Sequence, residues 1–354
     1  MFVSDRHLLD ARVGRARLWP AWLLLALLPG CLVTAENDIF GSDRNYTNGF
    51  RGLHSFERPQ PGSAEHDALN GLQRRASELS ESLDLFELEV PHDNTRRTHV
   101  GLVFGQVIFT PENLTTERLI LDDRPYAGWL YTGLVHTTSL FDDDDTRRRD
   151  EQAYVELDIG VVGPLSYAEQ TQTIVHRAIN ADVAKGWDNQ LHNEAALLLR
   201  VGRQSRDAYW NDGGAWSGDS ISGWQLNAGN VAVSALLGNT WRWGYELPRT
   251  FALGVGERST ATGNLNGAPD SIYGFFGVDG RAVLRDIFLD GNSFRDSHSV
   301  SKQNFVGAAR AGIAWHSGNW FLAFAHERRT REFEEQRSNG HAFSSISAGY
   351  RLGR

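Results

Sequence analysis

The chain has 354 residues, of which 41% are hydrophobic and 22% charged, with a formal net charge of -9 at pH 7. A mean hydropathy of -0.39, without an interior apolar run of about 20 residues, excludes a membrane protein built of several helices. The aromatic content of 11% excludes a disordered chain, the single cysteine excludes a disulfide scaffold, and the negative charge argues against a general nucleic-acid binder.

The beginning of the chain has the pattern of an export signal. Several arginines precede an apolar stretch over residues 18–28, which is too short to span a bilayer. We predict a signal peptide over residues 1–30, cleaved at one of residues 30 to 35, and a single domain over residues 31–354. Val33-Thr34-Ala35 offers small residues with suitable spacing for the later cut.

Apolar and polar residues alternate in many short stretches beyond the signal. In residues 153–161, apolar side chains stand at every odd position, with mostly polar or small residues between them. A period of two indicates a β-strand with unlike faces, and clusters of Gly, Asn and Asp separate the stretches. We expect about twelve to thirteen strands. They lie near 31–38 and at 46–56, 98–109, 128–140, 152–162, 194–204, 222–236, 239–246, 250–256, 272–284, 303–315, 319–328 and 342–352.

Such strands fit either a soluble barrel or sandwich or a transmembrane barrel, because periodicity does not show which face points inward. The export signal, strands of about ten residues and abundant glycine favour the transmembrane barrel. Aromatic residues near strand ends agree: Trp129, Tyr131, Trp241, Trp243, Trp315 and Trp320. Unlike most such barrels, the chain does not end in an aromatic residue, since Tyr350 is followed by four more. We predict an all-β fold, a transmembrane antiparallel β-barrel of about 12 strands with a short helix in an outer loop.

An up-and-down barrel that starts in the periplasm places three segments at its outer end. These are residues 38–47, 110–127 and 163–193, the parts of the chain richest in polar and special residues. The inner end receives residues 57–97 and the charge runs near residue 145, which are typical of solvated turns.

Residues 75–89 at the inner end are compatible with a short amphipathic helix. Its stripe would contain Leu79, Leu83 and Phe86.

The first outer segment joins Asn37 and Asp38, at the end of one strand, to Thr47 at the start of the next. A hairpin mouth would bring these oxygen donors together, and Ca²⁺ takes about six to eight oxygen ligands. A polar turn rich in Asn and Asp explains the same residues without a metal.

The second outer segment contains Asp122, Asp123 and Arg124 before Pro125. Arg124 can bind a phosphate through two parallel hydrogen bonds. It can equally pair with a neighbouring aspartate and stabilise the turn into the next strand.

The third outer segment lacks alternation over residues 167–181, which predicts a helix inserted between two strands. Gln172, His176 and Asn180 follow at one-turn spacing and therefore share a face. Asp182 comes directly afterwards. A histidine on a loop helix beside carboxylates is suited to act as a general base, although such a histidine by itself is more often a surface residue.

Five motifs in this order make the sequence similar to a known family. They are Glu36-Asn37-Asp38, Tyr46-Thr47-Asn48-Gly49, Asp122–Trp129, Asp158–Pro164, and the His176 helix followed by Trp187–Glu194. Over residues 31–205 the chain resembles the lipid A 3'-O-deacylases, which are outer-membrane barrels. The resemblance implies Ca²⁺-dependent hydrolysis of an acyl ester on lipid A, between the barrel wall and a loop helix. It also implies that His176 is the catalytic histidine and that Asn37, Asp38 and Thr47 are polar site residues.

Two positions depart from the family's pattern. Asp182 stands where a member can have glutamate, and Thr115-Thr116 stand where a basic pair can occur. The resemblance therefore does not carry over the family's contacts to the phosphates of lipid A. It does require a strand before Glu36, which favours signal cleavage nearer residue 30.

On this resemblance we expect metal-assisted ester hydrolysis, with Ca²⁺ polarising the ester carbonyl and His176 activating water. A carboxylate, from Asp182 or Glu194, would orient the histidine. The expected site residues are His176, Asn37 and Asp182 for catalysis, Asp38, Asn37 and Thr47 for Ca²⁺, and Arg124 and Gln172 for the substrate.

Two other functions fit the same sequence. One is a non-catalytic outer-membrane barrel, a porin or a lipopolysaccharide-binding protein. The other is an acyl hydrolase that acts on phospholipids. For the lipid A hydrolase we expect a monomer in the bacterial outer membrane, with its site facing the outer leaflet. Its expected partners are lipopolysaccharide and the outer-membrane lipids, and no nucleic acid.

Overall fold

The computed structural model describes most of the barrel domain. The described residues are 31–37, 45–58, 71–85, 94–142, 149–211, 213–255 and 270–350. The predicted signal peptide over residues 1–30 and the calcium candidate Asp38 lie outside them.

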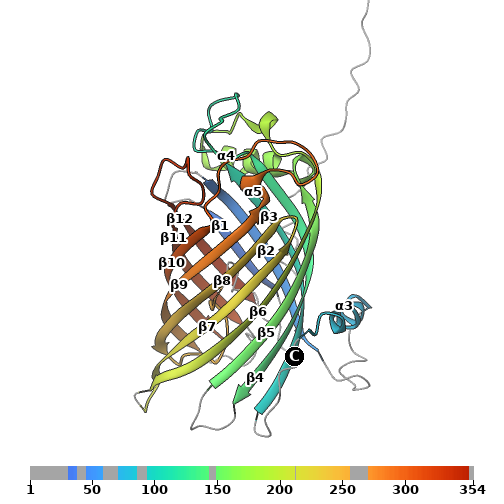
Figure 1. Ribbon diagram of the computed structural model, residues 1–354. Coiled ribbons are helices and arrows are strands. Elements are labelled where there is room, and N and C mark those ends of the chain that lie inside the picture. Colours follow the sequence, from blue (N-terminus) through green and yellow to red (C-terminus); the bar gives the residue numbers. More distant parts are fainter. Residues whose placement is uncertain are drawn as a thin grey trace, which may run out of the picture.

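Antiparallel strands form a closed barrel in which each strand pairs with its neighbours in the chain and β1 pairs with β12 (Figure 1). The strands are β1 (Cys31–Asn37), β2 (Asn45–Glu57), β3 (Asn94–Thr110), β4 (Ala127–Asp142), β5 (Arg149–Val162), β6 (Glu194–Asn211), β7 (Trp216–Gly229), β8 (Ala232–Tyr245), β9 (Ser271–Asp286), β10 (Phe305–Ser317), β11 (Trp320–Arg329) and β12 (His341–Tyr350). The helices are α3 (Gly71–Glu81), η1 (Pro164–Ser166), α4 (Ala168–Ile179), η2 (Trp187–Asn189) and α5 (Ile287–Asp290). The predicted all-β barrel is confirmed.

None of the helices in the described part of the chain has the length and apolar composition needed to cross a membrane.

The two faces of the wall differ as the alternation predicts. Glu156 of β5 accepts hydrogen bonds from Arg51 of β2 and Arg200 of β6, at 2.6 and 2.8 Å, and all three side chains are buried. Because β2 and β5 are not neighbours, these contacts cross the interior, so the polar face lines the lumen. Ile159 of β5 points the other way and is exposed.

The outer surface carries an apolar belt. Leu237, Ile313 and Ile346 are among its exposed residues. Four exposed tryptophans lie at the end of the barrel where β12 ends: Trp241, Trp243, Trp315 and Trp320. This is the arrangement of a lipid-facing wall with an aromatic girdle.

Two aromatic residues expected in the girdle lie elsewhere. Trp129 and Tyr131 are buried inside the barrel, and their stacked ring centroids are 4.2 Å apart. The odd positions of β4 face the lumen at this end, where other buried side chains pack around them, including Phe288 of α5, whose ring centroid lies 6.5 Å from that of Trp129. Their assignment to the membrane interface was wrong.

The lower lumen is filled by the chain itself. Arg242 of β8 bonds Asp219 of β7 at 2.7 Å and the carbonyl of Pro248 at 3.2 Å. Phe251 and Leu253 are also buried. The strand predicted over 250–256 is therefore wrong: its apolar residues are buried inside the barrel, and Leu253 has a positive φ of 60°, which no strand allows.

A second boundary was also misplaced. One strand was expected over 222–236, but β7 ends at Gly229 and β8 begins at Ala232. Because the apolar alternation continues through both strands, the sequence pattern does not indicate the tight turn at Asn230.

Loops 111–126 and 163–193 lie at the same end of the barrel as α4 and α5, at the top of Figure 1. This confirms that the two segments share one end. Helix α3 lies near the opposite end, outside the wall (Figure 1).

Candidate active site

Helix α4 is seated on the outer surface of the wall. Gln106, which points outward from β3, donates from Nε2 to the carbonyl of Ser166 at 2.6 Å. On β4, a Cβ atom at Gly128 would lie 2.2 Å from Cβ of Ala168 and from Oγ of Ser166. Glycine at this position therefore permits the close approach of η1 and α4 to the barrel.

An apolar cluster supports the helix from below. It contains Ile108, Leu114, Tyr126, Ala168, Ala184 and Trp187. Burial raises the pKa of the Tyr126 hydroxyl to about 12, so this ring stays neutral. The sequence motif around Trp187 thus supports α4, a role that the sequence analysis did not assign to it.

His176 lies on α4, as predicted, and only 3% of its surface is exposed. Its Nδ1 atom is 2.5 Å from the main-chain carbonyl oxygen of Asp182. A carbonyl oxygen can only accept, so Nδ1 carries the hydrogen and Nε2 has the lone pair of the neutral ring. That is the tautomer a general base requires.

The backbone turn at the C-terminal end of α4 brings the carbonyl of Asp182 to His176. Asn180 adopts a left-handed conformation, with φ of 55°, and its N–H donates to the carbonyl of His176. The reversal brings residue 182 back over the last turn of the helix.

The carboxylates proposed to orient His176 are placed differently. The side chain of Asp182 is exposed, and it is the main chain of this residue that contacts the imidazole. Glu194 accepts hydrogen bonds from Asn230, Asn292 and the backbone of Ser293, at 2.8 to 3.1 Å. Glu194 therefore ties the start of β6 to two neighbouring loops.

Gln172 lies one turn before His176 and is also buried. Its Oε1 atom accepts from Nε1 of Trp187 at 2.9 Å. Its Nε2 atom has no hydrogen-bond partner among the residues that the structure describes. An amide held at one end with a buried donor at the other can bind an oxygen of a ligand.

Arg124 is not brought together with His176. Its guanidinium lies 4.8 Å from the ring centroid of Phe109 on the lumen side and 3.4 Å from Glu332. The neighbouring aspartates have other partners. Asp122 pairs with Arg337, whose hydrogen bond lowers the pKa of that carboxyl, and burial raises the pKa of Asp123.

The strand ends proposed to hold Ca²⁺ lie beside the seat of α4. Asn37 of β1 pairs with Asn48 of β2, which pairs in turn with Ile108 of β3, a member of the apolar cluster. Thr47 falls at a β-bulge between Tyr46 and Asn48. Bulges often redirect side chains next to functional sites.

The donor set of this candidate metal site consists of amide, hydroxyl and carboxylate oxygens, which suits a hard cation such as Ca²⁺. Within the described ranges, no group of three or more His, Cys, Asp or Glu side chains could hold a metal ion. Asp38 is outside those ranges.

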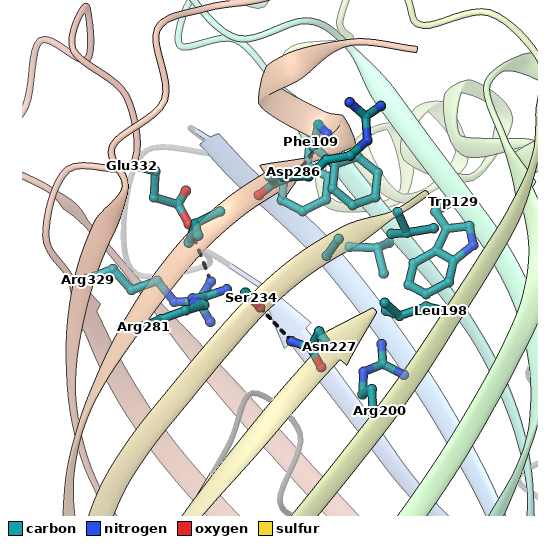
Figure 2. A pocket seen from close by; sticks show the side chains of 16 residues that line it. Phe109, Trp129, Leu198, Arg200, Asn227, Ser234, Arg281, Asp286, Arg329 and Glu332 are labelled. Atoms are coloured by element: carbon teal, nitrogen blue, oxygen red, sulfur yellow. Dashed lines mark hydrogen bonds and ion pairs between the residues drawn. The ribbon is translucent and has the colours of Figure 1, made fainter. Parts of the chain in front are cut away.

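A separate cavity of ≈ 80 Å³ lies in the lumen. Figure 2 shows Arg281, Arg329 and Glu332 on one side of it and Trp129 and Leu198 on the other. None of its lining residues is a histidine or a cysteine, and they include none of the predicted site residues. The predicted site residues therefore lie outside this cavity.

A closed barrel with a filled lumen, a lipid-facing belt and a helix seated outside its rim is an outer-membrane β-barrel. The chain matches the family model described as outer membrane protein LpxR over residues 27–352, and it belongs to that family.

Among solved structures, the chain is similar to LpxR from Salmonella typhimurium, with a TM-score of 0.67 and 17% identity over 91% of this chain and 99% of that one. The beta domain of the Bordetella autotransporter BrkA is more distant, with a TM-score of 0.42 and 7% identity over 91% of this chain and 98% of that one. No curated protein matches the chain.

Proposed function

We propose that this protein is an outer-membrane acyl-ester hydrolase that removes a 3'-linked acyl chain from lipid A with the help of Ca²⁺. The observation that carries the proposal is the buried His176 on α4, whose Nδ1 is held by the carbonyl of Asp182 at 2.5 Å. Membership of the LpxR family supports the choice of substrate.

In this reaction Nε2 of His176 takes a proton from a water molecule as the water oxygen bonds to the ester carbonyl carbon. The bond between that carbon and the sugar oxygen then breaks. The sugar oxygen receives the proton from His176, and the products are a fatty acid and a sugar hydroxyl. The carbonyl of Asp182 holds the ring orientation throughout and stabilises the protonated ring.

Asp38, Asn37 and Thr47 would hold the metal ion. Bound Ca²⁺ supplies positive charge that polarises the ester carbonyl and stabilises the oxyanion. Asn37 can also donate an amide N–H to the substrate.

We assign Gln172 to substrate binding, because its buried Nε2 donor has no hydrogen-bond partner among the described residues. Arg124 is buried against Phe109 and Glu332, so we assign it to holding the outer loops together instead.

The filled lumen argues against the porin alternative. Arg206, Asp219 and Arg242, on the neighbouring strands β6, β7 and β8, form buried ion pairs in its lower part, and Arg242 also donates to the carbonyl of Pro248 in the segment that fills it. A channel would need this space to be open to water.

Mass spectrometry of lipid A tests the proposal. Purified protein in detergent is incubated with lipid A and either Ca²⁺ or a chelator. We expect loss of one 3'-linked acyl chain only with Ca²⁺, and no loss with His176→Ala. As a control, His54→Ala changes a histidine of β2 near the opposite end of the barrel, where Cys31 pairs with both His54 and Tyr350, and it should keep full activity.

Three results would contradict the proposal. Unchanged acylation under both conditions would exclude the activity. Full activity of His176→Ala would exclude the role of this residue. Fatty-acid release from phospholipid vesicles, with lipid A left intact, would favour the phospholipid hydrolase.

A further inference from the structure

A polar patch on the outer face of β4 is hidden from lipid. Trp129 and Tyr131 show that odd positions of this strand face the lumen, so His136, Thr138 and Leu140 face outward. All three are nevertheless buried. In an outer-membrane barrel, polar groups on this face would meet lipid unless something covered them.

Helix α3 and the residues after it supply the cover. Asp84 lies 3.6 Å from Nε2 of His136 and 3.4 Å from Arg96 of β3. Within α3, Glu81 pairs with Arg58, just after the end of β2. These contacts fix the helix against the outside of the wall, near the end of the barrel that carries the tryptophan girdle (Figure 1).

The two sides of α3 have different chemistry. Ala76, Ser77 and Ser80 are buried, and their small side chains allow the helix to approach the wall closely. Leu72 and Leu79 are 64% and 65% exposed. Because seven residues make about two turns, these leucines share one face of the helix.

We propose that α3 is an interfacial helix that binds the phospholipids of the periplasmic leaflet. Leu72 and Leu79 insert at the boundary between headgroups and acyl chains, and Arg75, which is exposed beside them, contacts lipid phosphate. The leucines of α3 then extend the apolar, lipid-facing surface over the part of β4 that the helix covers. This inference is independent of any hydrolase activity.

Site-specific fluorescence tests the inference. Leu79→Cys and Glu78→Cys are made separately in a Cys31→Ser background, labelled with the environment-sensitive dye NBD, and folded into vesicles of phosphatidylethanolamine and phosphatidylglycerol. Glu78 is the matched control, because it is the exposed neighbour outside the leucine stripe. Heat-modifiable gel mobility confirms that both variants are folded.

We expect the label at position 79 to emit at shorter wavelength and to be quenched about twofold or more by lipids brominated in the acyl chains, whereas the label at position 78 is not. Equal and weak quenching at both positions would overturn the inference and leave α3 facing water or a protein partner. A Leu72→Cys variant repeats the test at the other leucine and must give the result of position 79.

Discussion

The imidazole of His176 depends on a main-chain oxygen and not on a carboxylate. The sequence offered Asp182 at a suitable spacing, but its side chain is exposed and its carbonyl makes the 2.5 Å contact. A main-chain contact leaves no residue-type signature, so it could not be predicted from the sequence.

Asp182→Ala tests this assignment. The substitution keeps the carbonyl, so we expect the rate of lipid A deacylation to stay within about twofold of the unchanged protein. Deacylation is followed by mass spectrometry, with His176→Ala as the inactive reference. A loss of activity in Asp182→Ala similar to that in His176→Ala would show that the carboxylate is needed.

Arg124 illustrates a second limit of sequence reasoning. Its nearest acidic residues in the chain are Asp122 and Asp123, yet its guanidinium meets Glu332 in the loop between β11 and β12. Asp122 is engaged by Arg337. Contacts between distant loops arise only when the barrel closes, so the local spacing that suggested an aspartate could not reveal Glu332.

Among the secondary-structure elements, the helix over residues 167–181 and most strands could be predicted because their periodicity is local. The segment 250–256 could not, since its apolar pattern is the same whether it faces lipid as a strand or fills the lumen as a turn. The position of α4 against the barrel wall could not be predicted from the sequence either, because it depends on the absence of a side chain at Gly128.

Gly128→Ala is expected to displace α4 without opening the barrel. The new Cβ would lie 2.2 Å from Ala168 and Ser166, so η1 and α4 must move away from the wall. We expect at least about a tenfold loss of deacylation, which corresponds to roughly 1.4 kcal/mol, with unchanged heat-modifiable mobility.

Gly280→Ala is the matched control, because a Cβ atom there meets nothing within 4 Å. It should keep full activity. Equal activity of the two variants would mean that the position of α4 does not matter for the reaction.

The stability of the whole barrel rests in part on charges buried in the lumen. Asp219 bonds both Arg206 and Arg242, at 2.6 and 2.7 Å, and is fully buried. Asp219→Asn removes the anion and leaves two guanidinium groups without it, which should lower the free energy of unfolding by about 3–5 kcal/mol.

Urea unfolding of the barrel in vesicles, followed by tryptophan fluorescence, measures this change. Asp207→Asn on the neighbouring strand is the control: its ion pair with Arg149 is exposed and long, at 3.8 Å, so it should change stability by less than about 1 kcal/mol. Identical midpoints for the two variants would show that the luminal pairs are dispensable.

The pairing of β1 with β12 has a consequence for how the protein is made. Cys31 pairs with Tyr350, so the seam of the cylinder forms between the first and the last strand of the barrel. Contacts so far apart along the chain slow folding. Until the last strand has been delivered, β1 is a sheet edge able to pair with another molecule. Assembly into the membrane must therefore protect this edge until translocation of the whole chain is complete.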